Sequence, residues 1–165
     1  MADEQFTLFN TGEGAPAGAT TDPSGVDFDA IPTSAAVPIP PGIYPDLETL
    51  GTHCRGCLRC DLAATRTHVV VSRGSPTAPI LIIGEGPGQQ EDEQGLPFVG
   101  KSGQLLEKIL ASVRLDTDKD VYICNIVKCR PPENRVPTSA EVAACKGYLL
   151  EQIRMVDPKI ILLTG

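Results

Sequence analysis

Six cysteines are the residues of this 165-residue chain whose spacing most directly suggests chemistry. Cys54 and Cys57 form a C-x-x-C pair, in which a short loop can direct two thiolates at one metal centre. By itself the pair fits a redox site, half of a zinc site or half of an iron–sulfur site. Cys129 and Cys145 are too far apart for the second close pair of a zinc ribbon. We expect the other two cysteines, Cys60 and Cys124, to be ordinary packing residues.

A glycine-rich loop, Gly84-Glu85-Gly86-Pro87-Gly88, is the second candidate for chemistry. Its spacing is G-x-G-x-G, whereas a dinucleotide-binding loop has G-x-G-x-x-G and opens directly into a helix. We expect the next helix only near Ser102, and the acidic residues 91–93 would repel a pyrophosphate. The pattern therefore argues against a nucleotide cofactor.

Phe98 and Asn125 are candidates for contacts with a planar ligand. The Asn125 amide offers both a hydrogen-bond donor and an acceptor to a heterocycle, and Phe98 offers an aromatic face. Both also have ordinary interpretations, Phe98 as a core residue and Asn125 as a turn residue at the end of a strand. The cations of residues 128–135 fit phosphate contacts or a solvated surface equally well.

Apolar patterning predicts the elements that would position these residues. We expect strands at 79–83, 121–127 and 160–163, and helices at 102–113, at 138–155 and within 46–64. Alternating strands and helices predict an α/β fold with a short parallel sheet. Ligands of such sheets bind at the carboxyl ends of the strands, where the glycine-rich loop and Asn125 lie.

Charge is distributed unevenly along the chain. Residues 1–50 hold 8 of the 21 carboxylates and no Lys or Arg, which leaves 13 acids and 14 bases in residues 51–165. That balance permits contact with phosphates.

The composition divides the chain into a tail and a domain. Residues 1–45 are rich in small residues and prolines and have no apolar period, which predicts a disordered tail. Residues 46–165 are then expected to form a single domain. No apolar run suits a membrane span or a secretory signal, so we expect a cytoplasmic protein.

Three segments together resemble the family 4 uracil-DNA glycosylases, the iron–sulfur members of the uracil-DNA glycosylase superfamily. They are the glycine-rich loop, the stretch G-L-P-F-V-G at 95–100 and the stretch N-I-V-K-C-R-P-P at 125–132. The resemblance runs from about residue 51 to residue 165. It implies a three-layer α/β/α fold and a monomer that removes uracil from single- or double-stranded DNA to start base excision repair, acting at the nucleoid of a bacterial cell. It also implies a [4Fe–4S] cluster on Cys54, Cys57, Cys129 and Cys145.

The resemblance also implies roles for individual residues. A uracil flipped out of the DNA stack would lie on Phe98, and Asn125 would read its edge. Backbone N–H groups of the glycine-rich loop would stabilise charge on uracil O2. Glu85 and Gly86 occupy the part of the loop that handles water, and Glu91 or Glu85 would orient the water or stabilise the sugar cation. Because Gly86 stands where another branch has an aspartate, the glycosidic bond is expected to break largely before water attacks.

Family members continue with a fourth strand and a loop that carries a histidine in an H-P-S-like motif. We therefore expect residues 46–165 to be a C-terminally incomplete domain, and an inactive fragment that binds a cluster or DNA is the alternative function. A relative of phage polymerase segments is a further alternative. Near the N-terminus, Q-F-T-L-F at 5–9 resembles the peptide that docks on the bacterial sliding clamp, with Gln5, Leu8 and Phe9 as contacts.

Overall fold

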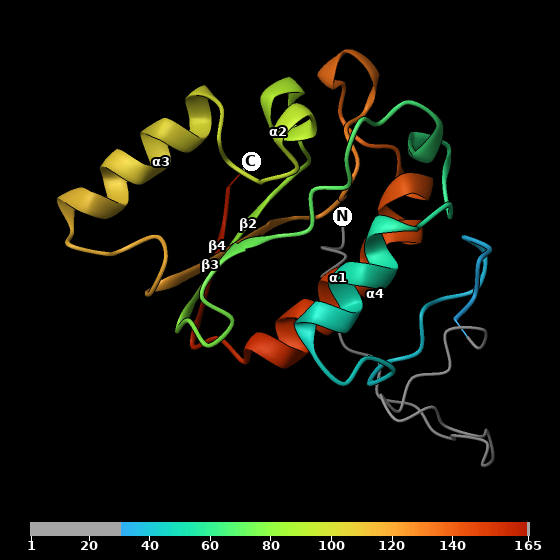
Figure 1. The fold of residues 1–165 in the computed structure, drawn as a ribbon, viewed down its shortest axis with the longest axis horizontal. Coiled ribbons are helices and arrows are strands. Elements are labelled where there is room, and N and C mark those ends of the chain that lie inside the picture. Colours follow the sequence, from blue (N-terminus) through green and yellow to red (C-terminus); the bar gives the residue numbers. More distant parts are fainter. Residues whose placement is uncertain (1–30, 165) are drawn as a thin grey trace, which may run out of the picture.

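A computed structural model describes residues 31–164 of the chain. Four strands form one sheet in the order β1-β3-β2-β4, and Figure 1 shows α3 and α4 on opposite sides of these strands. The architecture is therefore α/β with helices on both faces, as the sequence predicts. The proposed clamp contacts Gln5, Leu8 and Phe9 lie outside the described residues.

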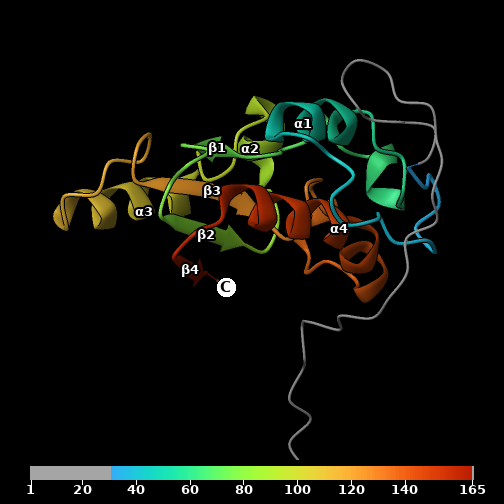
Figure 2. The same ribbon diagram turned by 90° about the horizontal axis from the view of Figure 1, so that it is seen from below.

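The three predicted strands are confirmed as β2 (Ile80–Gly84), β3 (Val121–Asn125) and β4 (Ile160–Leu163). They run parallel, with β2 paired to β3 on one side and to β4 on the other. Runs of Ile, Leu and Val suit β2 and β3 because both faces of these strands are covered. Figure 2 shows β4 at one edge of the sheet, and its four side chains are exposed.

The sheet is mixed rather than wholly parallel, which corrects the sequence-based expectation. A two-residue strand, β1 (Arg73–Gly74), pairs antiparallel with β3. A strand this short has no alternating pattern that the sequence could reveal. Gly74 is required there because its φ is 93° and a Cβ would overlap the Val121 carbonyl.

Two helices cover the two faces of the sheet. On one face α3 (Lys101–Ser112) packs Leu106 and Leu110 against side chains of β2 and β3. On the other face α4 (Ser139–Val156) packs against the alternate side chains of the same strands. The predicted α4 start is confirmed by a capping box between Thr138 and Glu141. The remaining long helix, α1 (Leu47–Arg55), lies against α4.

The region after the glycine-rich loop differs from the expectation that no helix forms before Ser102. A six-residue helix, α2 (Gln89–Gln94), begins directly after Gly88 and ends at Gly95, whose φ is 72°. Helix α3 then starts at Lys101 with Gly100 as its N-cap. Helix α2 was not predicted, because its six residues include the acidic run 91–93 and show no apolar period. Two 3-10 turns complete the elements, Asp61–Ala64 and Pro132–Asn134.

Residues 31–45, which the composition assigned to the tail, pack against the domain. Ile39 and Tyr44 are buried in the same cluster as Leu50 and Tyr148. The backbone N–H of Gly42 donates to Glu151 Oε1 at 2.7 Å. Within the described residues, the packed core therefore includes side chains from 31–45 as well as from 46–164. None of the helices among residues 31–164 has the length and apolar character needed to cross a membrane.

Candidate functional site

Phe98 and Asn125 meet at the carboxyl edge of the sheet. Gly84 ends β2 directly opposite Asn125, the last residue of β3. A Cβ at Gly84 would overlap Asn125 Oδ1 and would lie 2.6 Å from Phe98 Cζ, so only glycine allows both side chains to approach this point. The structure thus brings together the two residues that the sequence proposed as ligand contacts.

The backbone of Phe98 is held in an unusual conformation. Its φ is 56°, in the left-handed region that non-glycine residues rarely adopt. Arg73 stabilises this turn, because Nε donates to the Pro97 carbonyl at 2.8 Å and Nη2 donates to the Phe98 carbonyl at 3.0 Å. Arg73 also pairs with Glu107 of α3. These contacts fix the direction in which the Phe98 ring points.

Glu91 and Asp92 of α2 hold two different backbone segments. Glu91 Oε1 accepts from the backbone N–H groups of Val99 at 3.0 Å and Gly100 at 2.7 Å. Asp92 is buried and accepts from the N–H groups of Thr67 and His68. These two of the three carboxylates of α2 therefore fix the backbone around the helix.

Glu85 and Gly86 line a surface hollow beside the glycine-rich loop. Its other lining residues are Pro87, Gly88, Pro131, Asn134, Arg135 and Pro137. Glu91 does not line this hollow, but its Oε2 lies close to Gly88, which does: a Cβ at Gly88 would lie 2.9 Å from that oxygen. Asn134 was missed from the sequence. Its place beside two prolines and two arginines could have indicated a turn that faces the glycine-rich loop.

An ion pair anchors the far side of this hollow to α4. The Arg135 guanidinium donates to both carboxylate oxygens of Glu141, at 2.6 and 2.9 Å. This pairing is the main reason that the pKa of Glu141 falls to about 2. The backbone N–H of Thr138 donates to the same carboxylate at 2.7 Å. The loop that carries Asn134 is therefore fixed at the start of α4.

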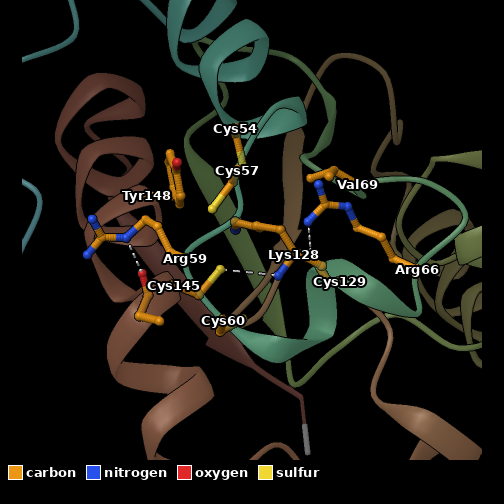
Figure 3. Close-up of a pocket in the computed structure, with 12 residues that line it drawn as sticks. Cys54, Cys57, Arg59, Cys60, Arg66, Val69, Lys128, Cys129, Cys145 and Tyr148 are labelled. Carbon is orange, nitrogen blue, oxygen red and sulfur yellow. Dashed lines mark hydrogen bonds between the residues drawn. The ribbon is translucent and has the colours of Figure 1, made fainter. Parts of the chain in front are cut away.

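The four cysteines proposed as cluster ligands line a second pocket, shown in Figure 3. They come from separate segments, with Cys54 in α1, Cys57 just after it, Cys129 beyond β3 and Cys145 in α4. Cys60 lines the same pocket, whereas we expected it to be an ordinary packing residue. Cys124 is buried within β3, as expected of a core residue.

Burial and positive charge compete at these thiols. Burial raises the pKa of Cys54, that of Cys129 to about 11 and that of Cys145 to about 12. Charge on neighbouring cysteines raises all three further, whereas Lys128 lowers the pKa of Cys54 and Cys145. Arg66 Nη1 also lies 3.4 Å from Cys129 Sγ. Such thiols ionise together only when a cationic centre binds them.

The donor set is all sulfur, but its arrangement does not match a single ion. Among residues 31–164, no group of three or more His, Cys, Asp or Glu side chains is arranged to hold a metal ion. The four thiols that line this pocket are nonetheless the kind of donor set that an iron–sulfur cluster requires.

Comparison with known proteins places this geometry in a family. The model of the uracil DNA glycosylase superfamily matches residues 71–165. The type-4 uracil-DNA glycosylase of Thermotoga maritima is 45% identical over 119 residues, which are 72% of this chain and 62% of the relative. The type-4 enzyme of Archaeoglobus fulgidus is 44% identical over 119 residues, 72% of this chain and 59% of the relative.

A third relative is a different kind of protein. The DNA polymerase of Bacillus phage SP01 is 42% identical over 93 residues, which are 56% of this chain and 10% of the polymerase. The chain spans about three-fifths of the length of the two type-4 relatives. The match of the family model to more than half of the chain confirms the resemblance seen in the sequence: the chain belongs to the uracil DNA glycosylase superfamily.

Proposed function

We propose that this protein removes uracil from DNA by hydrolysing its N-glycosidic bond, the first step of base excision repair. The observation that carries the proposal is the meeting of Gly84, Phe98 and Asn125 at the carboxyl edge of the sheet. An aromatic face and an amide at one point suit a planar base that has left the DNA stack. The names of the type-4 relatives agree with this substrate.

Asn125 would supply the selectivity for uracil. A fixed amide can donate to uracil O4 and accept from N3–H, whereas cytosine presents the opposite polarity at both positions. Binding cytosine would leave polar groups unpaired in a buried site, which disfavours it strongly. Asn125 is only 2% exposed, so water does not replace the missing hydrogen bonds.

Glu85 is the carboxylate that we assign to water, because it lines the hollow with Gly86 and Asn134. As the glycosidic bond breaks, the sugar becomes an oxocarbenium-like cation and the base an anion. Backbone N–H groups of the glycine-rich loop would stabilise the anion at O2, and Glu85 would orient water toward the sugar. Glu91 acts indirectly in this scheme, by holding the backbone N–H groups of Val99 and Gly100 just after Phe98.

We further propose that Cys54, Cys57, Cys129 and Cys145 hold a [4Fe–4S] cluster. Bound there, the group would supply structural cross-linking between α1, the segment after β3 and α4. The four thiols, the positive charge of Lys128 and the contact from Arg66 support the proposal. Cys129→Ala should therefore lose most of the bound iron and acid-labile sulfide, while the equally buried Cys124→Ala should keep both. Equal iron in the two variants would contradict this ligand set.

Release of free uracil tests the proposed activity. The protein, purified without air, is incubated with a single-stranded oligonucleotide that contains one uracil, and a cytosine oligonucleotide of the same sequence is the control. We expect uracil release from the first alone, and a loss of roughly 100-fold or more in Asn125→Ala. No release by folded protein that contains iron, or full release by Asn125→Ala, would refute the proposal.

The alternative is a protein that binds a cluster or DNA without catalysis. It is favoured by the places of the two described histidines, neither of which lines the hollow beside Glu85. His53 contacts Tyr44 and Tyr148, and His68 contacts Asp92. Binding of the uracil oligonucleotide without release of uracil would establish this alternative.

A further inference from the structure

Lys128 is a buried cation between the two sites described above. Its side chain is 1% exposed and lies along the cysteine pocket. Its Nζ donates to the Asn125 carbonyl at 2.6 Å, and its backbone N–H lies 3.3 Å from Cys145 Sγ (Figure 3). One residue therefore contacts both the proposed cluster ligands and the residue proposed to read the base.

The charge of Lys128 has no carboxylate to balance it among the described residues, because none of the ion pairs of residues 31–164 includes Lys128. Burial of an ammonium group without a compensating charge is costly. A cluster bound by four thiolates carries net negative charge and would provide that compensation. The cysteine pocket is the part of the surroundings of Lys128 that could hold this compensating negative charge.

The hydrogen bond to Asn125 acts on the peptide group that follows it. The N–H of this peptide, which belongs to Ile126, donates to the Gly84 carbonyl at 2.8 Å. Its carbonyl, which belongs to Asn125, accepts from Lys128. The peptide plane is thus held from both sides, which fixes ψ of Asn125 and the backbone from which its side chain projects opposite Gly84.

We propose that Lys128 is a positioning residue that connects the cysteine pocket to Asn125. The negative cluster holds the ammonium group, and the ammonium group fixes the peptide that orients the Asn125 amide. The inference rests on the proposed glycosylase function and extends it, because it gives the cluster site an influence on base recognition through this chain's own contacts. Neither site needs to move for this influence to operate.

The test compares Lys128→Met with Lys108→Met, an exposed lysine of α3, in the iron-containing protein. In Lys128→Met we expect a more negative reduction potential of the cluster, because a nearby positive charge is lost. The single-turnover rate of uracil release at saturating DNA should fall at least about tenfold, while the DNA dissociation constant changes less than about twofold. Lys108→Met should match the wild type in all three.

Hydrogen exchange provides a readout that does not depend on catalysis. We expect the Ile126 amide to exchange faster in Lys128→Met, because one of the two contacts that hold its peptide is gone. Unchanged potential and unchanged exchange would overturn the inference. If wild-type protein releases no uracil, the proposed function fails, and the potential and the exchange rate still decide the role of Lys128. Should Lys128→Met not fold, Lys128→Gln removes the charge and is judged by the same two measurements.

Discussion

Phe98 combines two features at the scale of single residues, a left-handed backbone and a ring in contact with Gly84. Backbone strain of this kind costs about 1–3 kcal/mol and persists only where surrounding contacts maintain it. Arg73 and Glu91 provide those contacts from opposite sides of the loop. The ring is therefore placed before a ligand arrives, which lowers the entropy that binding must offset.

Gly84→Ala tests how closely Phe98 and Asn125 approach each other. The added methyl group overlaps both side chains, so we expect stability to fall by about 1–3 kcal/mol and uracil release to fall further than DNA binding. Gly51→Ala is the matched control, because its Cβ would meet only the flexible Arg55 side chain at 3.6 Å or more. Thermal unfolding and single-turnover assays make the comparison. An active, fully stable Gly84→Ala would show that the site is looser than described.

At the scale of elements, the start of α4 depends on the pairing of Arg135 with Glu141. The pKa of Glu141 is lowered from 4.5 to about 2 by this pairing. The ionised carboxylate therefore stabilises the folded state above about pH 4.5, and this contribution is lost as the pH falls toward 2. Glu141→Gln should unfold at lower urea concentration than wild type at pH 7, and the difference should shrink below pH 4.5. A difference independent of pH would contradict the assignment.

The elements also show what the sequence could predict. Strands β2 and β4 were predicted because each is a run of Ile and Leu, and β3 because it lies in the short apolar stretch 121–127. Helix α4 was predicted because Thr138 and Glu141 form a recognisable cap. Helix α2 and strand β1 were missed because they are six and two residues long and are held by tertiary contacts rather than by local pattern.

The prediction of the site had the same limit as the prediction of the elements: residues with a local sequence pattern were found, and residues placed only by tertiary contacts were missed. Asn125 was found because it ends a predicted strand, and Phe98 because it lies between the glycine-rich loop and the next predicted helix. The places of Asn134 and Lys128 at the two pockets depend instead on where the chain folds back. Segments distant in sequence met at both pockets, and no local spacing records such a meeting.

At the scale of the whole molecule, the segment 31–45 completes the core beside the cysteine pocket. Arg59 holds this segment through the carbonyls of Pro32 and Val37, and it also donates to Ala144, next to Cys145. Ile39 packs closely on Gly147 of α4, because a Cβ added at Gly147 would lie only 2.6 Å from the Cβ of Ile39. The segment therefore packs in the same core cluster as Cys54, Cys129 and Cys145, although it does not line their pocket.

Two deletions test this role. The composition predicts that residues 1–30 are disordered, so their removal should leave the melting temperature near that of the full chain. Removal of residues 1–45 also takes away buried Ile39 and Tyr44 and should lower it by roughly 10 °C or more, with faster loss of iron in air. Calorimetry and iron assays measure both effects, and equal melting temperatures would show that residues 31–45 add no stability.

The central position of β2 has a consequence for how the chain folds. Ile80 pairs with Val121 on one side and with Ile160 on the other. The two strands that flank β2, which are β3 and β4, are therefore synthesised much later than β2 itself. Contacts between such distant residues form slowly, because a long loop must close first. During synthesis the apolar side chains of β2 therefore stay exposed until first β3 and then β4 have been synthesised and can pair with it. The order in which these strands leave the ribosome sets the interval in which a nascent chain of this family most needs protection from aggregation.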